Sequence, residues 1–299
     1  MPAAIGRPDL WPIALAGFLA RGGIVLFVAP IVSPPSLVGL ATFIGPASIT
    51  PSGPTSGLIL RIAVTAGVLG GAILLGTIAG SAAELALIEQ SGGSSGEAVP
   101  GLLRRIVLIR LIGLLPVAVV LGLGIQELGQ IVYQELTLPT DLVSPMVIRV
   151  AVRAPAIVGA ILVAWLAGET WAGLATRLAV LRGAGVGRAL TGAFGVVIRR
   201  ATTVVPLAIL SVLLAAGVLG LVIGLIGWSW DFVRAALLAP GGSGDLLALA
   251  GSTVLFIACW LSGLTIAGAL AAGRGVAWTL VVGQDHRGSG GTVPEGATL

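Results

Sequence analysis

The sequence predicts an all-α fold, a polytopic transmembrane helix bundle of about six spans, and two observations carry this prediction. Hydrophobic residues make up 57% of the 299 positions and charged residues only 9%, with a mean hydropathy of +1.10, which is outside the range of soluble domains. Six apolar runs are each long enough to cross about 30 Å of hydrocarbon as a helix. Because these runs are continuous rather than alternating, helices are expected and not a β-barrel.

The spans are expected within one transmembrane domain covering residues 1–283. Their expected positions are 10–32, 58–85, 102–124, 146–168, 202–226 and 247–272. The first run is expected to be an uncleaved span, because it is too long for the core of a signal peptide and is interrupted by Arg21. The tail, 284–299, is polar and rich in glycine, and is expected to be disordered and cytoplasmic.

Small residues recur inside the apolar runs. Close helix–helix packing in lipid favours such spacings, which occur at Gly67/Gly71, Gly76/Gly80, Gly220/Gly224 and Gly268/Ala272. An Ala-Gly pair also occurs near the same end of each even-numbered span, at Ala79-Gly80, Ala167-Gly168 and Ala267-Gly268. This recurrence indicates three repeated helical hairpins of similar orientation, or a coincidence of a two-letter signature.

The arginines indicate an orientation. Eleven of the 16 fall at the N-terminus, in the even-numbered loops or at the C-terminus, and four flank the other face. The positive-inside rule then places both termini in the cytoplasm. All basic residues are arginine and the apolar residues are biased to Ala, Gly, Val and Leu, which suggests a GC-rich bacterial genome. We therefore expect a multi-pass protein of the bacterial cytoplasmic membrane.

Arg21 is the sharpest candidate for a functional residue, because a charge this far inside a span is costly unless it is paired, hydrated or able to reach the interface. The carboxylates nearest in expected depth are Glu84 and Glu169. One interpretation is a charged pathway or anion site made by Arg21, Glu84 and Glu169. The other is a structural ion pair, or an arginine that extends to a cytoplasmic boundary.

A second candidate is the cytoplasmic segment 176–200, which mixes arginines with large apolar residues. Such a segment can lie among lipid head groups as an amphipathic helix, with its arginines on anionic lipid, or it can dock a cytoplasmic partner. The arginines concerned are Arg177, Arg182, Arg188, Arg199 and Arg200.

Several classes of function are disfavoured. The single histidine, His286, lies in the polar tail and the single cysteine, Cys259, lies in an apolar run, so neither a metal site nor a histidine-dependent catalytic triad is expected. No nucleotide-binding or cofactor-binding motif is present, and no cofactor is expected. The arginines form no patch interleaved with aromatic residues, so nucleic acid is not an expected partner.

The stretch from Leu178 to Arg200, LAVLRGAGVGRALTGAFGVVIRR, resembles a linker in bacterial six-span proteins akin to the membrane domain of glycerophosphodiester phosphodiesterases. In that group a helix end, a short Gly turn, an Ala-Leu pair and a basic segment lead into the fifth span. The resemblance implies a six-span membrane fold. It does not imply hydrolysis, because those enzymes carry their chemistry in a separate soluble barrel. The family pattern often has an acidic residue where Arg182 stands here.

Val205-Pro206 after Arg199-Arg200 is also similar to the cytoplasmic element of permease subunits of ATP-driven importers, although the acidic-Ala-Ala element expected upstream is absent. The leading hypothesis from the sequence is a non-enzymatic structural, assembly or lipid-interacting membrane component. The alternative is a transporter or permease subunit with a pathway near Arg21, partnered by other membrane subunits or a cytoplasmic ATPase.

Overall fold

The computed structural model describes residues 7–32, 49–50, 53–91, 101–138, 146–238 and 243–288. Within these ranges the chain is helical except for short connections and one pair of two-residue strands, β1 (Ile49–Thr50) and β2 (Gly53–Pro54), which run antiparallel. Six of the helices described are long and apolar enough to cross a membrane. The predicted fold class, an all-helical multi-pass membrane bundle, is therefore confirmed.

The six spans differ in how continuous they are. The first consists of a 3₁₀ turn η1 (Pro8–Leu10), α2 (Trp11–Phe18), a π-helical turn η2 (Leu19–Gly23) and α3 (Ile24–Val28). The second is α5 (Ser56–Gln90) and the third is α6 (Leu102–Gly113) continued by α7 (Leu115–Thr137). The last three are α9 (Pro155–Arg182), α11 (Ala201–Leu238) and α12 (Ser243–Gly288). Two shorter helices, α8 (Met146–Arg153) and α10 (Val186–Arg199), precede α9 and α11.

Several helix boundaries differ from those expected. The fourth span begins at Pro155 and not at Met146, because Pro155 occupies the first turn of α9, where its missing N–H costs nothing. Residues 146–153 form the separate helix α8 instead. The backbone of α12 stays helical to Gly288, so the expected disorder is wrong for 284–288, and 289–299 lie outside the described residues. Apolar length sets only the minimum for a span, since a helix can continue into water.

The first span is broken at Arg21 and Gly22, which the sequence did not predict. Gly22 adopts a φ of 100°, and Arg21 has a ψ of 20°. A φ in this region favours glycine, because a Cβ would clash with the backbone there. The break turns the chain between α2 and α3, and it lies beside the charged side chains described below.

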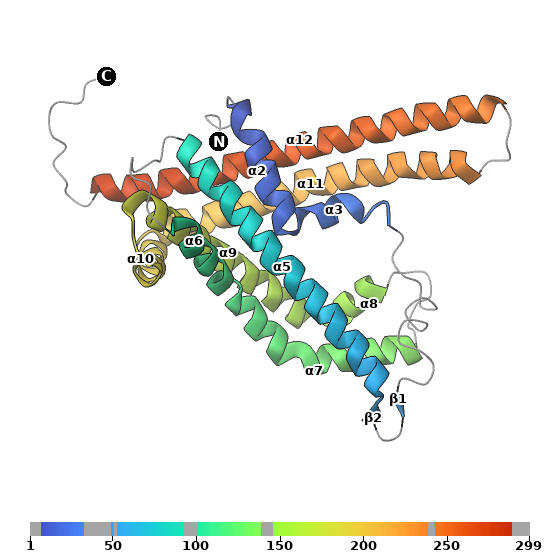
Figure 1. Cartoon of the computed structure of the whole chain (residues 1–299), viewed down its shortest axis with the longest axis horizontal. Helices are drawn as coiled ribbons and strands as arrows, with labels where there is room; N and C mark the ends of the chain where they lie inside the picture. Colours follow the sequence, from blue (N-terminus) through green and yellow to red (C-terminus); the bar gives the residue numbers. More distant parts are fainter. Residues whose placement is uncertain are drawn as a thin grey trace.

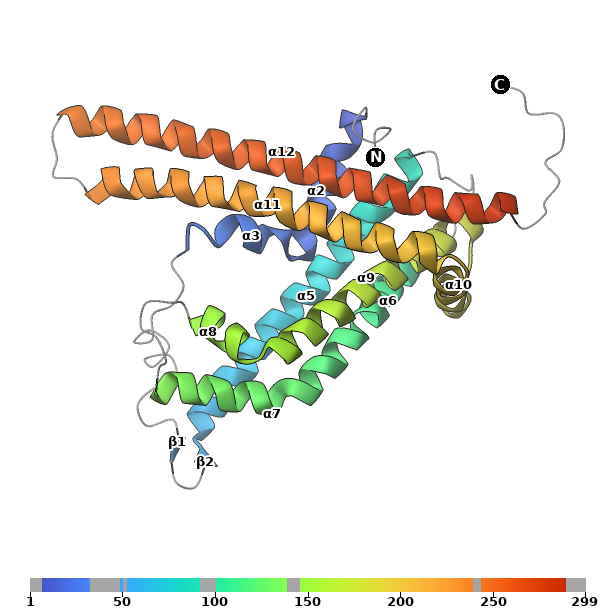
Figure 2. The same cartoon turned by 180° about the vertical axis from the view of Figure 1, so that it is seen from behind.

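The helices converge at one end of the molecule and separate at the other (Figures 1 and 2). α11 and α12 lie side by side as a long antiparallel pair, while α5, α6, α7 and α9 form a second group that runs away from them. We call the end that holds α10 and the start of α6 the convergent end. The end that holds α8 and the last turns of α7 and α11 is the divergent end.

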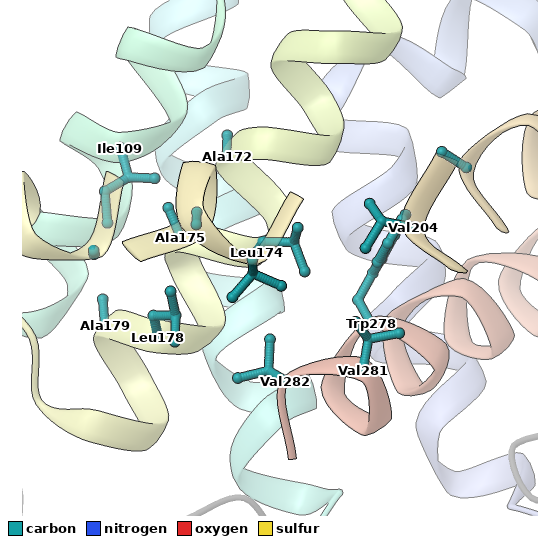
Figure 3. Close-up of a cluster of buried hydrophobic side chains, with 14 residues drawn as sticks. Ile109, Ala172, Leu174, Ala175, Leu178, Ala179, Val204, Trp278, Val281 and Val282 are labelled. Carbon is teal, nitrogen blue, oxygen red and sulfur yellow. The ribbon is translucent and has the colours of Figure 1, made fainter. Parts of the chain in front are cut away.

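The largest apolar core lies at the convergent end (Figure 3). It is built around α9, whose residues Leu174, Ala175 and Ala179 are almost completely buried. Trp278 and Val282 of α12 pack onto it, together with residues of α6, α10 and α11. Small side chains on α9 allow these helices to approach closely, which increases dispersion contacts in lipid.

Close helix crossings occur where glycines remove the side chain. A Cβ at Gly168 of α9 would overlap the carbonyl oxygen of Gly113 in α6, and one at Gly76 of α5 would overlap the carbonyl oxygen of Ala20. The expected packing at Gly76/Gly80 and Gly268/Ala272 therefore occurs. A Cβ at Gly268 would lie 2.8 Å from the carbonyl oxygen of Trp11, and Ala272 is buried.

The other two glycine pairs expected at helix–helix contacts, Gly67/Gly71 and Gly220/Gly224, contact no second helix among the described residues. A Cβ at Gly67, Gly71, Gly220 or Gly224 would meet no other atom within 4 Å. For these pairs the expectation stays a prediction, because spacing alone does not bring a second helix of the same chain to the face that carries the glycines. The three Ala-Gly pairs also differ in their neighbours, and the hairpin repeat stays a prediction.

Candidate functional site

Six charged side chains from five spans meet near the convergent end, and we call them the charge network. Its members are Arg21 of η2, Glu84 of α5, Arg110 of α6, Glu169 and Arg177 of α9, and Arg274 of α12. The network therefore links every span except the fifth. Charged groups in an apolar environment are expected to pair in this way, because isolated charges there are costly.

Arg110 and the two glutamates form the centre of the network. The Nε atom of Arg110 donates to Oε2 of Glu84 at 2.8 Å, and its Nη2 atom donates to the same carboxylate. Its Nη1 atom donates to Oε2 of Glu169 at 3.0 Å. One guanidinium thus joins α5 and α9 through charge-assisted hydrogen bonds, using the fixed fork of donors that suits arginine to this position.

Arg177 approaches Glu84 from the other side. Its Nη1 atom donates to Oε1 of Glu84 at 3.0 Å and to the carbonyl oxygen of Gly173 at 2.7 Å. Its Nη2 atom donates to the carbonyl oxygen of Gly275 at 3.1 Å, which connects α9 to α12. The side chain is only 3% exposed, and its buried Nε atom has no hydrogen-bond partner.

Arg21 and Arg274 lie at the more open edge of the network. Nη1 of Arg21 is 3.5 Å from Glu84 and 3.7 Å from Glu169, and Nη2 of Arg274 is 3.8 Å from Glu169. These separations exceed the 2.7–2.9 Å typical of charge-assisted hydrogen bonds. The side chains of Arg21, Glu169 and Arg274 are 32%, 24% and 26% exposed, whereas Glu84 is 3% exposed.

Glycines make room for this arrangement. A Cβ at Gly80 of α5 would lie 2.7 Å from Cγ of Arg21, so the arginine stem can cross α5 only where no side chain is present. Nε of Arg21 donates to the carbonyl oxygen of Gly17 at 3.2 Å. Backbone and side-chain packing therefore position Arg21 beside the two carboxylates.

The structure brings together the three residues that the sequence singled out, Arg21, Glu84 and Glu169, but it adds three arginines that sequence reasoning did not include. Arg110 belongs to the third expected span, 102–124, and lies eight positions after Leu102, the first residue of α6. This is similar to the distance of Glu84 from the end of α5 at Gln90. A comparison of depths could therefore have identified Arg110.

Arg177 was expected to contact lipid or a partner as part of segment 176–200, and this was wrong. α9 continues to Arg182, so residues 176–182 of that segment belong to the fourth span, and Arg177 is buried in the charge network. The separate surface helix is α10, which begins at Val186. Arg182, Arg188 and Arg199 are exposed at the convergent end, and Arg200 is half-buried.

α10 presents a mixed face to its surroundings. Ala189, Ala193 and Val196 are buried against the core, which leaves Phe194 60% and Ile198 62% exposed. Exposed Arg188 and Arg199 stand at the two ends of the same helix. Large apolar side chains beside cations are typical of helices that lie in the interface of a bilayer.

A smaller ion-paired cluster occupies the divergent end. Nε of Arg149 lies 3.0 Å from Glu135, and Nη1 of Arg153 lies 2.9 Å from the same carboxylate. Arg153 also donates to the side-chain oxygen of Gln134 at 2.8 Å. Among the described residues, these ion pairs link α7 to α8.

Among the described residues, no group of three or more His, Cys, Asp or Glu side chains lies close enough to hold a metal ion. No family model matches the chain, and searches of curated proteins and of solved structures found no match either.

Proposed function

We propose that this chain is a non-enzymatic, lipid-interacting component of a bacterial cytoplasmic membrane, with both termini in the cytoplasm. The observation that carries the proposal is α10, a surface helix at the convergent end with exposed Phe194 and Ile198 between exposed arginines. In the head-group layer such a helix places its apolar side chains toward hydrocarbon and its cations against anionic lipid.

The distribution of charge supports this placement. Arg104 and Arg182 are also exposed at the convergent end, and Arg105 donates to the carbonyl oxygen of Gly183 at 3.4 Å. Juxtamembrane arginines of this density favour the cytoplasmic face, where anionic lipids add about 1 kcal/mol per cation near the surface. The charge network then lies deeper in the membrane than these arginines, and it joins five of the six spans to one another.

The depth of α10 tests the proposal. A spin label at Ile198→Cys, in a Cys259→Ser background, is expected to be reached by oxygen dissolved in lipid and shielded from a water-soluble nickel reagent. The shielding is expected to increase when phosphatidylglycerol is added to phosphatidylcholine nanodiscs. The increase should be smaller in Arg188→Gln and unchanged in Arg234→Gln, whose site is exposed at the divergent end. Free access of the nickel reagent in both lipids would contradict the proposal.

A second candidate is a transporter or permease subunit, and the break in the first span favours it. Transport sites are commonly built where a transmembrane helix is interrupted, and here Gly22 follows an arginine that is 32% exposed. Arg21→Cys in the Cys259→Ser background tests this. Modification by a membrane-impermeant thiol reagent from either face of the bilayer would support a water-filled pathway, and protection from both faces would count against it.

A further inference from the structure

The charge network carries more positive than negative charge. Its described members are four arginines, Arg21, Arg110, Arg177 and Arg274, and two glutamates, Glu84 and Glu169. With all six ionised, four positive and two negative charges leave an excess of two. An uncompensated charge in an apolar surrounding is costly, so the described members of the network would gain from a bound anion.

The unused donors lie on particular arginines. Arg110 directs three donor atoms at carboxylates. By contrast, the buried Nη2 atom of Arg274 has no hydrogen-bond partner, and its separation of 3.8 Å from Glu169 is too long for a hydrogen bond. Nη1 of Arg21 is likewise 3.5 Å or more from both carboxylates. The excess charge and the free donors therefore coincide at the Arg21–Arg274 edge.

This edge is also the accessible part of the network. Arg21 and Arg274 are 32% and 26% exposed, whereas Arg110 and Arg177 are almost fully buried. Glu169 reaches the same edge, and its Oε1 atom is the common neighbour of Nη1 of Arg21 at 3.7 Å and Nη2 of Arg274 at 3.8 Å. An anion that meets the exposed surface of both guanidinium groups therefore lies beside Glu169, and it reaches the buried Nη2 atom of Arg274 only if that side chain turns outward.

The depth of the edge suits a phosphate group. Glu169 and Arg274 lie one and two positions beyond the ends of their apolar runs, at 168 and 272, and Glu84 lies one position before the end of its run, at 85. Because an apolar run covers the hydrocarbon of the bilayer, the edge lies near the level where lipid phosphates meet the acyl chains.

We infer that Arg21 and Arg274 form a binding site for a phosphate-type oxyanion, which completes the charge balance of the network. The inference rests on the proposed lipid-interacting function, and it adds a ligand site that is separate from α10. Arginine forks suit tetrahedral oxyanions because two N–H groups can meet two oxygens. An anionic lipid head group and a free phosphate share this chemistry.

Thermal unfolding of the full chain in nanodiscs tests the inference. The probes are phosphatidylcholine alone, phosphatidylcholine with an equal part of phosphatidylglycerol, and phosphatidylcholine with added inorganic phosphate. Ligands that bind only the folded state raise the midpoint of unfolding. We expect phosphatidylglycerol to stabilise the wild-type protein. An equal response to inorganic phosphate would assign the site to a soluble oxyanion, and no response to either probe would overturn the inference.

Arg274→Gln separates an anion site from a structural ion pair. If the site binds an oxyanion, this variant loses the response to phosphatidylglycerol, with a fall in affinity of about tenfold or more. In phosphatidylcholine alone its stability is unchanged or higher, because one uncompensated charge is gone. Arg274→Lys keeps the charge and should retain part of the response, and Arg234→Gln should respond as the wild type does.

Two results would overturn the assignment. One is a full phosphatidylglycerol response in Arg274→Gln. The other is equal destabilisation of Arg274→Gln in both lipids, which is the behaviour of a residue that only pairs with Glu169. This test measures the unfolding of Arg274 variants, whereas the test of α10 measures the depth of Ile198 in the bilayer. The anion site can therefore be disproved while the proposed function stands, and the proposed function can be disproved while the anion site stands.

Discussion

The two ends of this molecule are held together by different means. At the convergent end, charged side chains from five spans pair with one another and an apolar core surrounds α9. At the divergent end α5, α7 and the α11–α12 pair separate (Figure 1), and large apolar side chains such as Leu60, Leu123 and Leu247 are more than 60% exposed.

The difference between the two ends follows from the lipid that surrounds the helices. Lipid tails are as apolar as leucine, so burying leucine against another helix in a membrane gains little. Hydrogen bonds between charged groups and close contacts at glycines have no equivalent in lipid. Most of these contacts lie at the convergent end, where they link five spans, whereas the described ion pairs of the divergent end link α7 to α8.

The largest expected effect comes from breaking the centre of the charge network. Glu84→Gln removes the carboxylate that Arg110 and Arg177 share, and it should lower the free energy of unfolding by about 3–5 kcal/mol, because two buried cations lose their counter-charge. Thermal or denaturant unfolding in a fixed lipid measures this. Glu89→Gln, on the exposed face of the same helix, is the matched control, and an equal loss in both variants would contradict the role of the network.

The next effect concerns the closest helix crossing. Gly168→Ala places a methyl group against the carbonyl oxygen of Gly113 and should cost roughly 2–3 kcal/mol, since two backbones must separate. Gly220→Ala provides the control, because its added methyl would meet nothing within 4 Å. Similar unfolding midpoints for the two variants would mean that α6 and α9 do not cross as closely as the structure shows.

A smaller effect is expected from the cluster at the divergent end. Glu135→Gln removes the carboxylate that Arg149 and Arg153 share. We expect a cost of about 1–2 kcal/mol, in the range of a hydrogen bond to a charged group, because the short helix α8 can move and expose its arginines to water. Hydrogen exchange should increase in α8 and not in α9. A global loss as large as that of Glu84→Gln would remove the contrast between the two ends.

The smallest effect is expected on the open half of α5. Gly67→Ala adds a methyl group where no other atom lies within 4 Å, so it should raise stability by up to about 1 kcal/mol through helix propensity alone. Unfolding of the protein at low and high protein-to-lipid ratios measures this. Destabilisation that appears only at high ratio would show that another polypeptide packs on this face.

Part of the site was predictable. The depth of a residue follows from counting along an apolar run, and counting placed Arg21, Glu84 and Glu169 at similar levels. The direction in which a side chain points around its helix does not follow from such a run, because every face of it is apolar. For this reason the position of Arg110 between two carboxylates and the burial of Arg177 were missed.

The sequence by itself determined that six stretches form membrane-spanning helices, because a backbone in hydrocarbon must satisfy its hydrogen bonds internally and each stretch is long enough to do so. Only the tertiary structure decided which helices cross, which glycines lie at those crossings, and which arginines share a carboxylate. These features depend on the rotation and tilt of helices that are apolar on almost every face. A few polar and small residues, which are distant in the sequence, therefore select how the helices pack.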